Sequence, residues 1–240
     1  YLDGIAKEVC GEFIHPSFNL HMVDTFRSSS KEPNFQNIPS RDGPIAKIVR
    51  SCYIPRKGNH LVEIDYAQIE VRVAACYHKD PTMLAYIDDP DSCMHRDTAM
   101  ELFFLTKEQV GKKTTRYWTK NKFVFPQFYG SVYFQCAPNL WESVLSGATV
   151  EGSDVTIKEH LKKHGIKRLG KCEPKGTPEP GTFEHHVKQI ENRMWDERFP
   201  EYTSWKRRWY ELYLSRGWFK SLTGFISRGL LKKNQVLNYV

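Results

Sequence analysis

The sequence has no long apolar run, no paired cysteines and no excess of acidic residues. Its mean hydropathy is −0.56, and no stretch reaches the roughly 18 apolar residues that a membrane-spanning helix needs. The 6 cysteines of this 240-residue chain form no CxxC pair, which argues against a zinc ribbon or a disulfide scaffold. The first residue is not Met, so no targeting segment can be read. We therefore expect a protein of a reducing compartment with no membrane partner.

The charge balance favours an anionic partner. The chain carries 35 Lys and Arg against 28 Asp and Glu, which gives a net charge of +7 and a pI near 9.0. A basic surface suits nucleic acid, but charge alone leaves a basic protein without such a partner equally open. The length corresponds to one large domain or two small ones. A hydrophobic content of 40% is enough for a packed core.

The order of predicted elements indicates an α+β fold. Residues 13–41 read as loop or short strands, and residues 46–65 as two strands joined by the turn RKGN at 56–59. A helix is predicted over 67–78, and mostly helical sequence continues to about 216. A Gly/Pro-rich linker interrupts it at 165–181. Residues 218–225 read as a strand and turn.

One carboxylate stands where a predicted strand ends. In LVEIDYAQIEVR the strand runs to Asp65, and the helical period begins immediately afterwards. A carboxylate at the C-terminal edge of a strand can bind Mg²⁺, which prefers oxygen ligands. An aspartate that only caps the following helix is the alternative, and it is the commoner situation.

A second motif combines cations with aromatic residues. Arg116 and Lys120 are four residues apart, so they share one helix face and can grip a triphosphate. Phe125, Phe128 and Tyr129 follow, and aromatic faces beside a phosphate clamp suit a nucleotide base. The alternative is an amphipathic helix with a basic solvent face and an aromatic core face.

A polar loop supplies the third motif. Arg27, Asn34, Gln36 and Asn37 lie in TFRSSSKEPNFQNIPSR. Amides and an arginine can reach the acceptors of the DNA minor groove, although an ordinary polar surface loop has the same composition.

In this order and spacing, the three motifs resemble those of the family A, DNA polymerase I-like, DNA polymerases. TFRSSSKEPNFQNIPSR is similar to that family's TxRxSSxxPNxQNIP, and DYAQIEVR to its motif A, DYSQIELR. RYWTKNKFVFPQFYG resembles the fingers helix RxxxKxxxFGxxYG. HRDTA at 95–99 and DERFPEYTSWKRRW at 196–209 are similar to two further stretches of the family.

The resemblance implies a role for each matching residue. Asp65 would be the catalytic metal ligand for two Mg²⁺ ions, with the Tyr66 carbonyl on one of them. Glu70 would lie against the sugar and exclude a 2′-hydroxyl. The other residues implied to bind the dNTP are Gln68, His95, Arg116, Lys120, Phe125 and Tyr129. Those implied to follow the primer–template DNA are Arg27, Asn34, Gln36, Asn37, Arg72 and Gly130.

The fingers helix departs from the family pattern in two ways. Lys120 and Phe125 are five apart instead of four, and Pro126 replaces the family's glycine. A proline inside a helix costs about 3 kcal/mol, and an inserted residue produces a π-bulge that could relieve the clash. We therefore expect a bulge or kink between Lys120 and Pro126. The same shift leaves Lys122 open as the alternative phosphate ligand.

A second carboxylate motif is missing. The family's motif C, His-Asp-Glu, does not occur in the sequence. The resemblance then implies a first part of the antiparallel palm (1–83), a mainly helical fingers domain (84–216) and a return towards the palm (217–240), truncated before motif C. The segment alone is expected to be inactive and to need the rest of the polymerase, in the same chain or in a second polypeptide. A non-catalytic DNA-binding module that keeps the fold is the alternative function.

Residues 145–182 match no part of the family pattern and are interpreted as an insertion in the fingers. It contains His160 and His164, four apart, with Cys172 nearby. A metal site is one reading, and a solvated basic helix is the commoner one. Lysines of this stretch could touch DNA. A phage or viral origin, with a location in the cytoplasm of a bacterium or infected cell, is the accompanying expectation.

Overall fold

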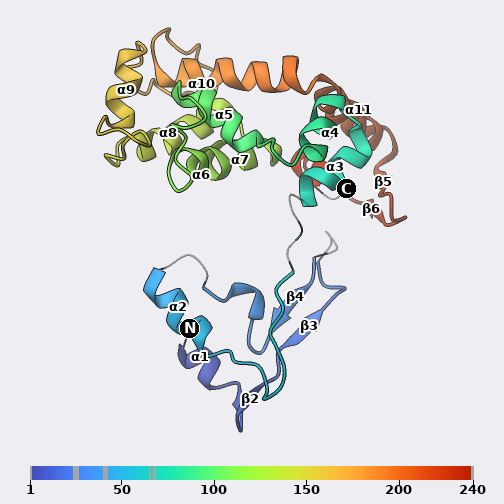
Figure 1. Ribbon diagram of the computed structural model, residues 1–240. Helices are drawn as coiled ribbons and strands as arrows, with labels where there is room; N and C mark the ends of the chain where they lie inside the picture. Colours follow the sequence, from blue (N-terminus) through green and yellow to red (C-terminus); the bar gives the residue numbers. More distant parts are fainter. Residues whose placement is uncertain (1, 24–26, 40–42, 65, 67–68, 239–240) are drawn as a thin grey trace. The chain divides into compact units, whose positions relative to one another are not determined.

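The computed structural model describes residues 2–23, 27–39, 43–64, 66 and 69–238. Contacts divide the chain into two compact units, an N-terminal unit (residues 1–68) and a helical unit (residues 69–238). The class is mixed α and β, as predicted, with many helices and small antiparallel strand pairs (Figure 1). None of the helices in these described ranges is long and apolar enough to cross a membrane.

The N-terminal unit is built from short elements: α1 (Leu2–Ala6), β1 (Val9–Cys10), β2 (Phe13–Ile14), β3 (Ser17–Asn19), β4 (Ser29–Lys31), the 3₁₀ turn η1 (Phe35–Asn37) and α2 (Gly43–Ser51). Strand β1 pairs with β2, and β3 with β4, both antiparallel. The Asn34 side chain caps η1 by accepting a hydrogen bond from the Gln36 N–H at 3.0 Å. The predicted loop and short strands are confirmed here.

The predicted hairpin over 46–65 is wrong. Its first half lies in helix α2, where Ala46 and Val49, three residues apart, form the buried stripe. The turn does form, because the Asn59 N–H donates to the Arg56 carbonyl at 2.9 Å. The described residues that follow, 59–64, contain no regular element. Strand propensity is expressed only where a neighbouring strand accepts the hydrogen bonds, and no such neighbour lies beside this segment in the described chain.

The helical unit contains the elements α3 (Ile69–His78), α4 (Pro81–Asp88), α5 (Met94–Phe103), α6 (Thr115–Thr119), the π-helix η2 (Lys120–Val124), α7 (Phe125–Phe128), α8 (Tyr133–Val144), α9 (Ile157–Lys163), α10 (Phe183–Asn192), the π-helix η3 (Arg193–Arg198), α11 (Pro200–Arg216), β5 (Trp218–Lys220), β6 (Ile226–Arg228) and α12 (Lys233–Asn238). The helices predicted after residue 67 are confirmed. Helix α8 packs against α10, and α5 packs against α6 (Figure 1). Fully buried Phe103, Phe123, Leu140 and Phe183 form the centre of the core.

The predicted irregularity between Lys120 and Pro126 is confirmed as a π-helix. The Phe125 N–H donates to the Lys120 carbonyl, five residues back. This wider turn accommodates the inserted residue. Pro126 then falls in the first turn of α7, where its missing N–H costs little. The helix therefore continues past the proline.

The predicted domain limits differ from the compact units. Helices α3 and α4, predicted to lie in the first palm segment, contribute Val71 and Met83 to the core of the helical unit. The Gly/Pro-rich stretch 165–181 is tied to the start of α10, because the Phe183 and Glu184 N–H groups donate to the Arg168 and Leu169 carbonyls. The assignment of palm, fingers and insertion stays a prediction.

A fully buried carboxylate joins the starts of two helices that are distant in sequence. Asp80 accepts a hydrogen bond from the Met83 N–H of α4 at 3.1 Å. Its other oxygen accepts from the Glu201 and Tyr202 N–H groups of α11, at 3.1 and 3.2 Å. One side chain thus caps α4 and α11 together, which holds the end of the helical unit containing α3 and α4 against α11.

Replacing this carboxylate is expected to destabilise the helical unit. Asp80→Ala removes two caps, at about 1 kcal/mol each. It also leaves buried N–H groups without partners, which adds about 1–3 kcal/mol. We expect a total loss of about 3 kcal/mol in urea unfolding followed by circular dichroism. The exposed Asp88 at the end of α4 provides the control, since Asp88→Ala should stay within about 0.5 kcal/mol of the parent. Equal stability of the two variants would contradict the shared cap.

Candidate functional site

Helices α5, α6 and α7, with the π-helix between the last two, bring four of the predicted nucleotide-binding residues together. The His95 and Phe125 rings meet edge to face, with centroids 5.5 Å apart. The Lys120 ammonium lies 5.0 Å from the Phe125 centroid. Arg116 and Lys120 share one face, one turn apart, and their charges act on His95. We call His95, Arg116, Lys120 and Phe125 the cationic cluster.

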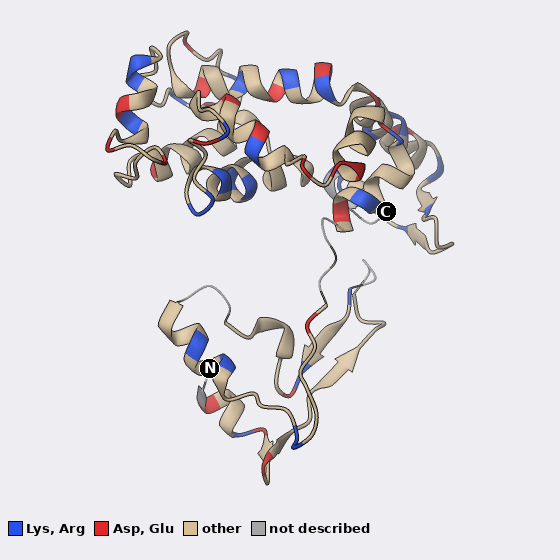
Figure 2. Ribbon diagram, viewed as in Figure 1, with Lys and Arg blue, Asp and Glu red and all other residues tan. Residues whose placement is uncertain are grey.

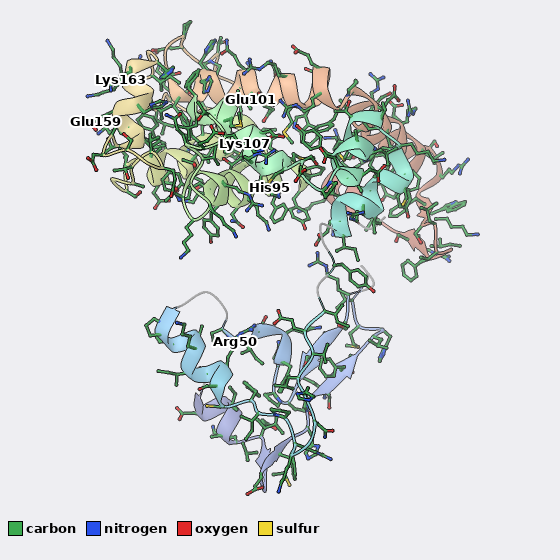
Figure 3. All side chains as sticks on the ribbon, viewed as in Figure 1. Arg50, His95, Glu101, Lys107, Glu159 and Lys163 are labelled. Atoms are coloured by element: carbon green, nitrogen blue, oxygen red, sulfur yellow. The ribbon has the colours of Figure 1, made fainter. Side chains whose placement is uncertain are left out.

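His95 is the buried member of the cationic cluster, on α5 (Figure 3). Burial, together with the neighbouring Lys120 and Arg116 charges, lowers the pKa of His95 to about 4. The imidazole is therefore neutral near pH 7 and can donate one hydrogen bond. Its Nδ1 is buried and has no hydrogen-bond partner within the described part of the protein. A buried donor beside two cations has the chemistry to bind an anion.

The two candidate lysines point to different neighbours. Lys120 lies over Phe125, inside the cationic cluster. Lys122 forms an ion pair with Glu142 of α8, 3.4 Å from Nζ to Oε2. Residues two apart on a helix do not share a face, so the two side chains point in different directions. This arrangement favours Lys120 as the phosphate ligand, and that assignment stays a prediction.

The remaining fingers residues lie at the end of the interrupted helix. Tyr129 is the C-cap of α7 and is half exposed, four residues after Phe125 and therefore on the same face. Gly130 follows with φ at +91°, a conformation that favours glycine and ends the helix.

Helix α3 carries two further predicted residues. Glu70 is exposed in its first turn. The Arg72 guanidinium donates to the Ile87 carbonyl at 3.3 Å, which ties α3 to the end of α4. A direct contact of Arg72 with DNA stays a prediction.

The other predicted site residues belong to the N-terminal unit. Asn34, Gln36 and Asn37 are exposed in and beside η1, and Gln36 Nε2 donates to the Ser28 hydroxyl at 2.6 Å. Arg27 is exposed just before β4. Tyr66 is exposed next to the start of the helical unit. Asp65 and Gln68 lie outside the described residues, so their predicted metal and dNTP contacts stay predictions.

The two histidines of the predicted insertion pack against Phe104. His160 Nε2 lies 3.0 Å from the Phe104 carbonyl, and the His164 ring stacks on Phe104 with centroids 4.6 Å apart. The described ranges contain no group of three His, Cys, Asp or Glu side chains arranged to hold a metal. Helix α9 carries exposed lysines around Glu159 (Figures 2 and 3).

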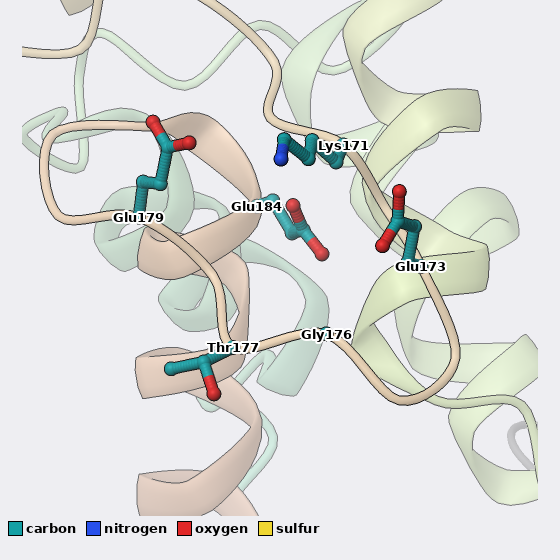
Figure 4. Close-up of a pocket in the computed structure, with 6 residues that line it drawn as sticks. All are labelled: Lys171, Glu173, Gly176, Thr177, Glu179 and Glu184. Carbon is teal, nitrogen blue, oxygen red and sulfur yellow. The ribbon is translucent and has the colours of Figure 1, made fainter.

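A small hollow of about 160 Å³ lies beside the 165–181 loop (Figure 4). It is lined by Lys171, Glu173, Gly176, Thr177, Glu179 and Glu184. Three of these side chains are carboxylates, so the hollow is poorly suited to a triphosphate. It includes none of the predicted nucleotide-binding residues.

Sequence reasoning missed two contacts around the cationic cluster. Arg116 Nε donates to the Cys93 sulfur at 3.3 Å, which orients the guanidinium. Gln127 of α7 is buried and bonded to α10 and η3. Neither contact leaves a local sequence signal, because each joins residues distant along the chain. For Asp80, the sequence Asp-Pro indicates the start of helix α4, but nothing local indicates the second cap at α11.

Comparison with known proteins shows which family the chain resembles. The profile of the family described as DNA polymerase family A matches residues 1–163. DNA polymerase I of Bacillus subtilis is 37% identical over 114 residues, which cover 46% of this chain and 13% of that protein. The DNA polymerase of Bacillus phage SP01 is 30% identical over 187 residues, 74% of this chain and 18% of that protein.

A solved structure shares the fold. The POL domain of Pol1 from M. smegmatis, in complex with DNA primer-template and dNTP, aligns with a TM-score of 0.64 and 19% identity over 99% of this chain and 35% of that chain. The chain thus spans only 13% and 18% of the two relatives named above. The family profile nevertheless covers well over half of the sequence, and the chain belongs to DNA polymerase family A.

Proposed function

We propose that the chain is the palm-and-fingers part of a DNA-directed DNA polymerase, which transfers deoxynucleotides to a primer 3′-hydroxyl with primer–template DNA and dNTPs as substrates. The observation that carries the proposal is the cationic cluster, in which a buried, neutral His95 with an unpaired Nδ1 lies near two cations. The family membership supports the reaction class. Arg116 and Lys120 bind the triphosphate, His95 donates a hydrogen bond to it, and Phe125 and Tyr129 frame the base and sugar.

The metal site is proposed from the donor chemistry. The oxygens that Asp65 and the Tyr66 carbonyl offer suit Mg²⁺, and two such ions, when bound, supply activation of the primer hydroxyl and neutralisation of the leaving pyrophosphate. One carboxylate is too few for two ions. The second carboxylate therefore comes from a palm segment outside these residues, in the same chain or in a partner.

Exposed apolar side chains support the need for that segment. Leu61, Val62 and Ile64 are 68%, 78% and 83% exposed, directly before Asp65. A run of large apolar residues this exposed marks a surface that another element covers. A palm segment pairing along residues 61–64 would bury these side chains and give the extended segment its strand partner.

The test is primer extension with labelled primer–template, dNTPs and Mg²⁺. The chain is assayed alone and together with the segment that completes the palm. We expect extension only in the combination. If the chain binds DNA but extends no primer, either alone or in the combination, the polymerase proposal is wrong. A non-catalytic DNA-binding module is then the remaining function.

Glu70 is expected to select the sugar. Its side chain, in the first turn of α3, would occupy the space that a ribose 2′-hydroxyl needs. Glu70→Ala should reduce the preference for dNTPs over rNTPs by about 100-fold, measured as the ratio of kcat/KM values for the two. Glu70→Gln keeps the volume and removes the charge, so it should keep most of the preference. If both variants discriminate like the parent, Glu70 is not the selecting residue.

A further inference from the structure

Helix α7 has two faces with different neighbours. Phe125 and Tyr129, four apart, lie on the face that the proposed function assigns to the nucleotide. Gln127, two residues after Phe125, lies on the opposite side, and Phe128 lies between the two faces. The Phe128 ring contacts Trp195 edge to face, at 5.3 Å between centroids. Gln127 is only 3% exposed.

Both ends of the Gln127 amide are engaged. Its oxygen accepts a hydrogen bond from the Trp195 indole N–H at 2.7 Å. Its nitrogen donates to the Glu191 carboxylate and lies 3.8 Å from the Cys136 sulfur. These partners come from three elements, namely η3, α10 and α8. The amide thus links the segment after one π-helix to a second π-helix.

Hydrogen bonds constrain this helix in a way that apolar packing does not. Contact between Phe128 and Trp195 tolerates small rotations, because burial of apolar surface is non-directional. The two hydrogen bonds of Gln127 require defined donor and acceptor directions. Helix α7 continues from the π-turn and contains Pro126, which lacks an N–H, so its backbone hydrogen bonds constrain its rotation less than those of an unbroken α-helix would. The Gln127 amide supplies that constraint.

We propose that Gln127 is a positioning residue for the nucleotide site: its hydrogen bonds to Trp195 and Glu191 fix the rotation of α7 and thereby aim Phe125 and Tyr129 at the incoming nucleotide. This inference rests on the proposed function. Gln127 itself touches neither nucleotide nor DNA. Its removal should therefore weaken dNTP binding more than it changes the rate of the chemical step.

The pair Gln127 and Glu191 allows a swap that separates positioning from simple stability. Q127E places a second carboxylate against Glu191, whose pKa burial raises, so at a pH where both groups are charged they repel each other and displace α7. In the double variant Q127E/E191Q the introduced carboxylate accepts from Trp195 and from the introduced amide. The hydrogen bond between positions 127 and 191 is then kept with its direction reversed. The side-chain volumes at both positions are nearly unchanged. E191Q alone is the matched control, because its amide oxygen can still accept from Gln127.

The experiment measures dNTP affinity in the polymerase completed by its remaining palm segment, on a primer–template whose primer lacks a 3′-hydroxyl. No chemistry occurs, so binding is read directly, and thermal unfolding is recorded for each variant. We expect Q127E to weaken dNTP binding about 10-fold or more. E191Q and Q127E/E191Q should bind within about twofold of the parent. With an extendable primer, KM should rise in Q127E while kcat changes little.

Two results would overturn the inference. One is Q127E binding dNTP like the parent. The other is Q127E/E191Q remaining as weak as Q127E although its unfolding temperature has returned to the parent value. If the parent polymerase itself binds no dNTP, the proposed function fails, and the inference fails with it. The three results are distinguishable in a single binding series.

Discussion

Replacing Asp65 by alanine is expected to slow primer extension by at least about 1000-fold. Asp65 is the carboxylate that this chain contributes to the proposed metal site. Its negative charge is needed to hold the ions, and a neighbouring carbonyl cannot replace it. The loss should appear in the rate of single-nucleotide addition at saturating dNTP, with primer–template binding retained. A lower rate with unchanged primer–template binding means that the substitution affects the chemical step.

Glu63 provides the matched control for this prediction. It is exposed, lies two residues earlier in the sequence and carries the same charge. Glu63→Ala should leave the addition rate within about twofold of the parent, as most surface substitutions do. An Asp65→Ala enzyme that retains a tenth of the parental rate would show that the metal ions are held elsewhere.

Lys120→Ala is expected to raise the KM for dNTP and to lower kcat/KM by about 100-fold, the usual effect of removing one positioned donor to a developing charge. Lys120 lies with Arg116 around the buried His95, so its ammonium is part of the proposed triphosphate clamp. Steady-state single-nucleotide addition over a range of dNTP concentrations measures the change. The effect should weaken for a nucleoside diphosphate, which offers less charge to the clamp.

Lys122→Ala tests which of the two lysines binds the triphosphate. Its ammonium is paired with the exposed Glu142, and such a surface ion pair contributes less than about 1 kcal/mol to stability. We expect kcat/KM within about threefold of the parent for this variant. The opposite ranking, with Lys122→Ala the more damaging change, would exchange the assignments of the two residues.

Local patterns in the sequence predicted what depends on neighbours along the chain. The spacing of Arg116 and Lys120 predicted their common face, and the departure from the family's Lys–Phe spacing predicted a bulge or kink, which is the π-helix. Both concern hydrogen bonds and side-chain positions within four or five residues along one helix, where the sequence is informative. The motifs themselves were long enough to indicate the family, which the profile match confirmed.

Tertiary structure decided everything that requires a partner from a distant segment. Residues 46–64 have the composition of strands, yet the described chain offers them no neighbouring strand, so Ala46 and Val49 are buried in a helix instead. The contacts of Gln127 with Glu191 and Trp195 span more than 60 positions, and those of Asp80 with α11 more than 120. A helix period carries no information over such separations. Only packing of the chain determines which buried polar group meets which partner.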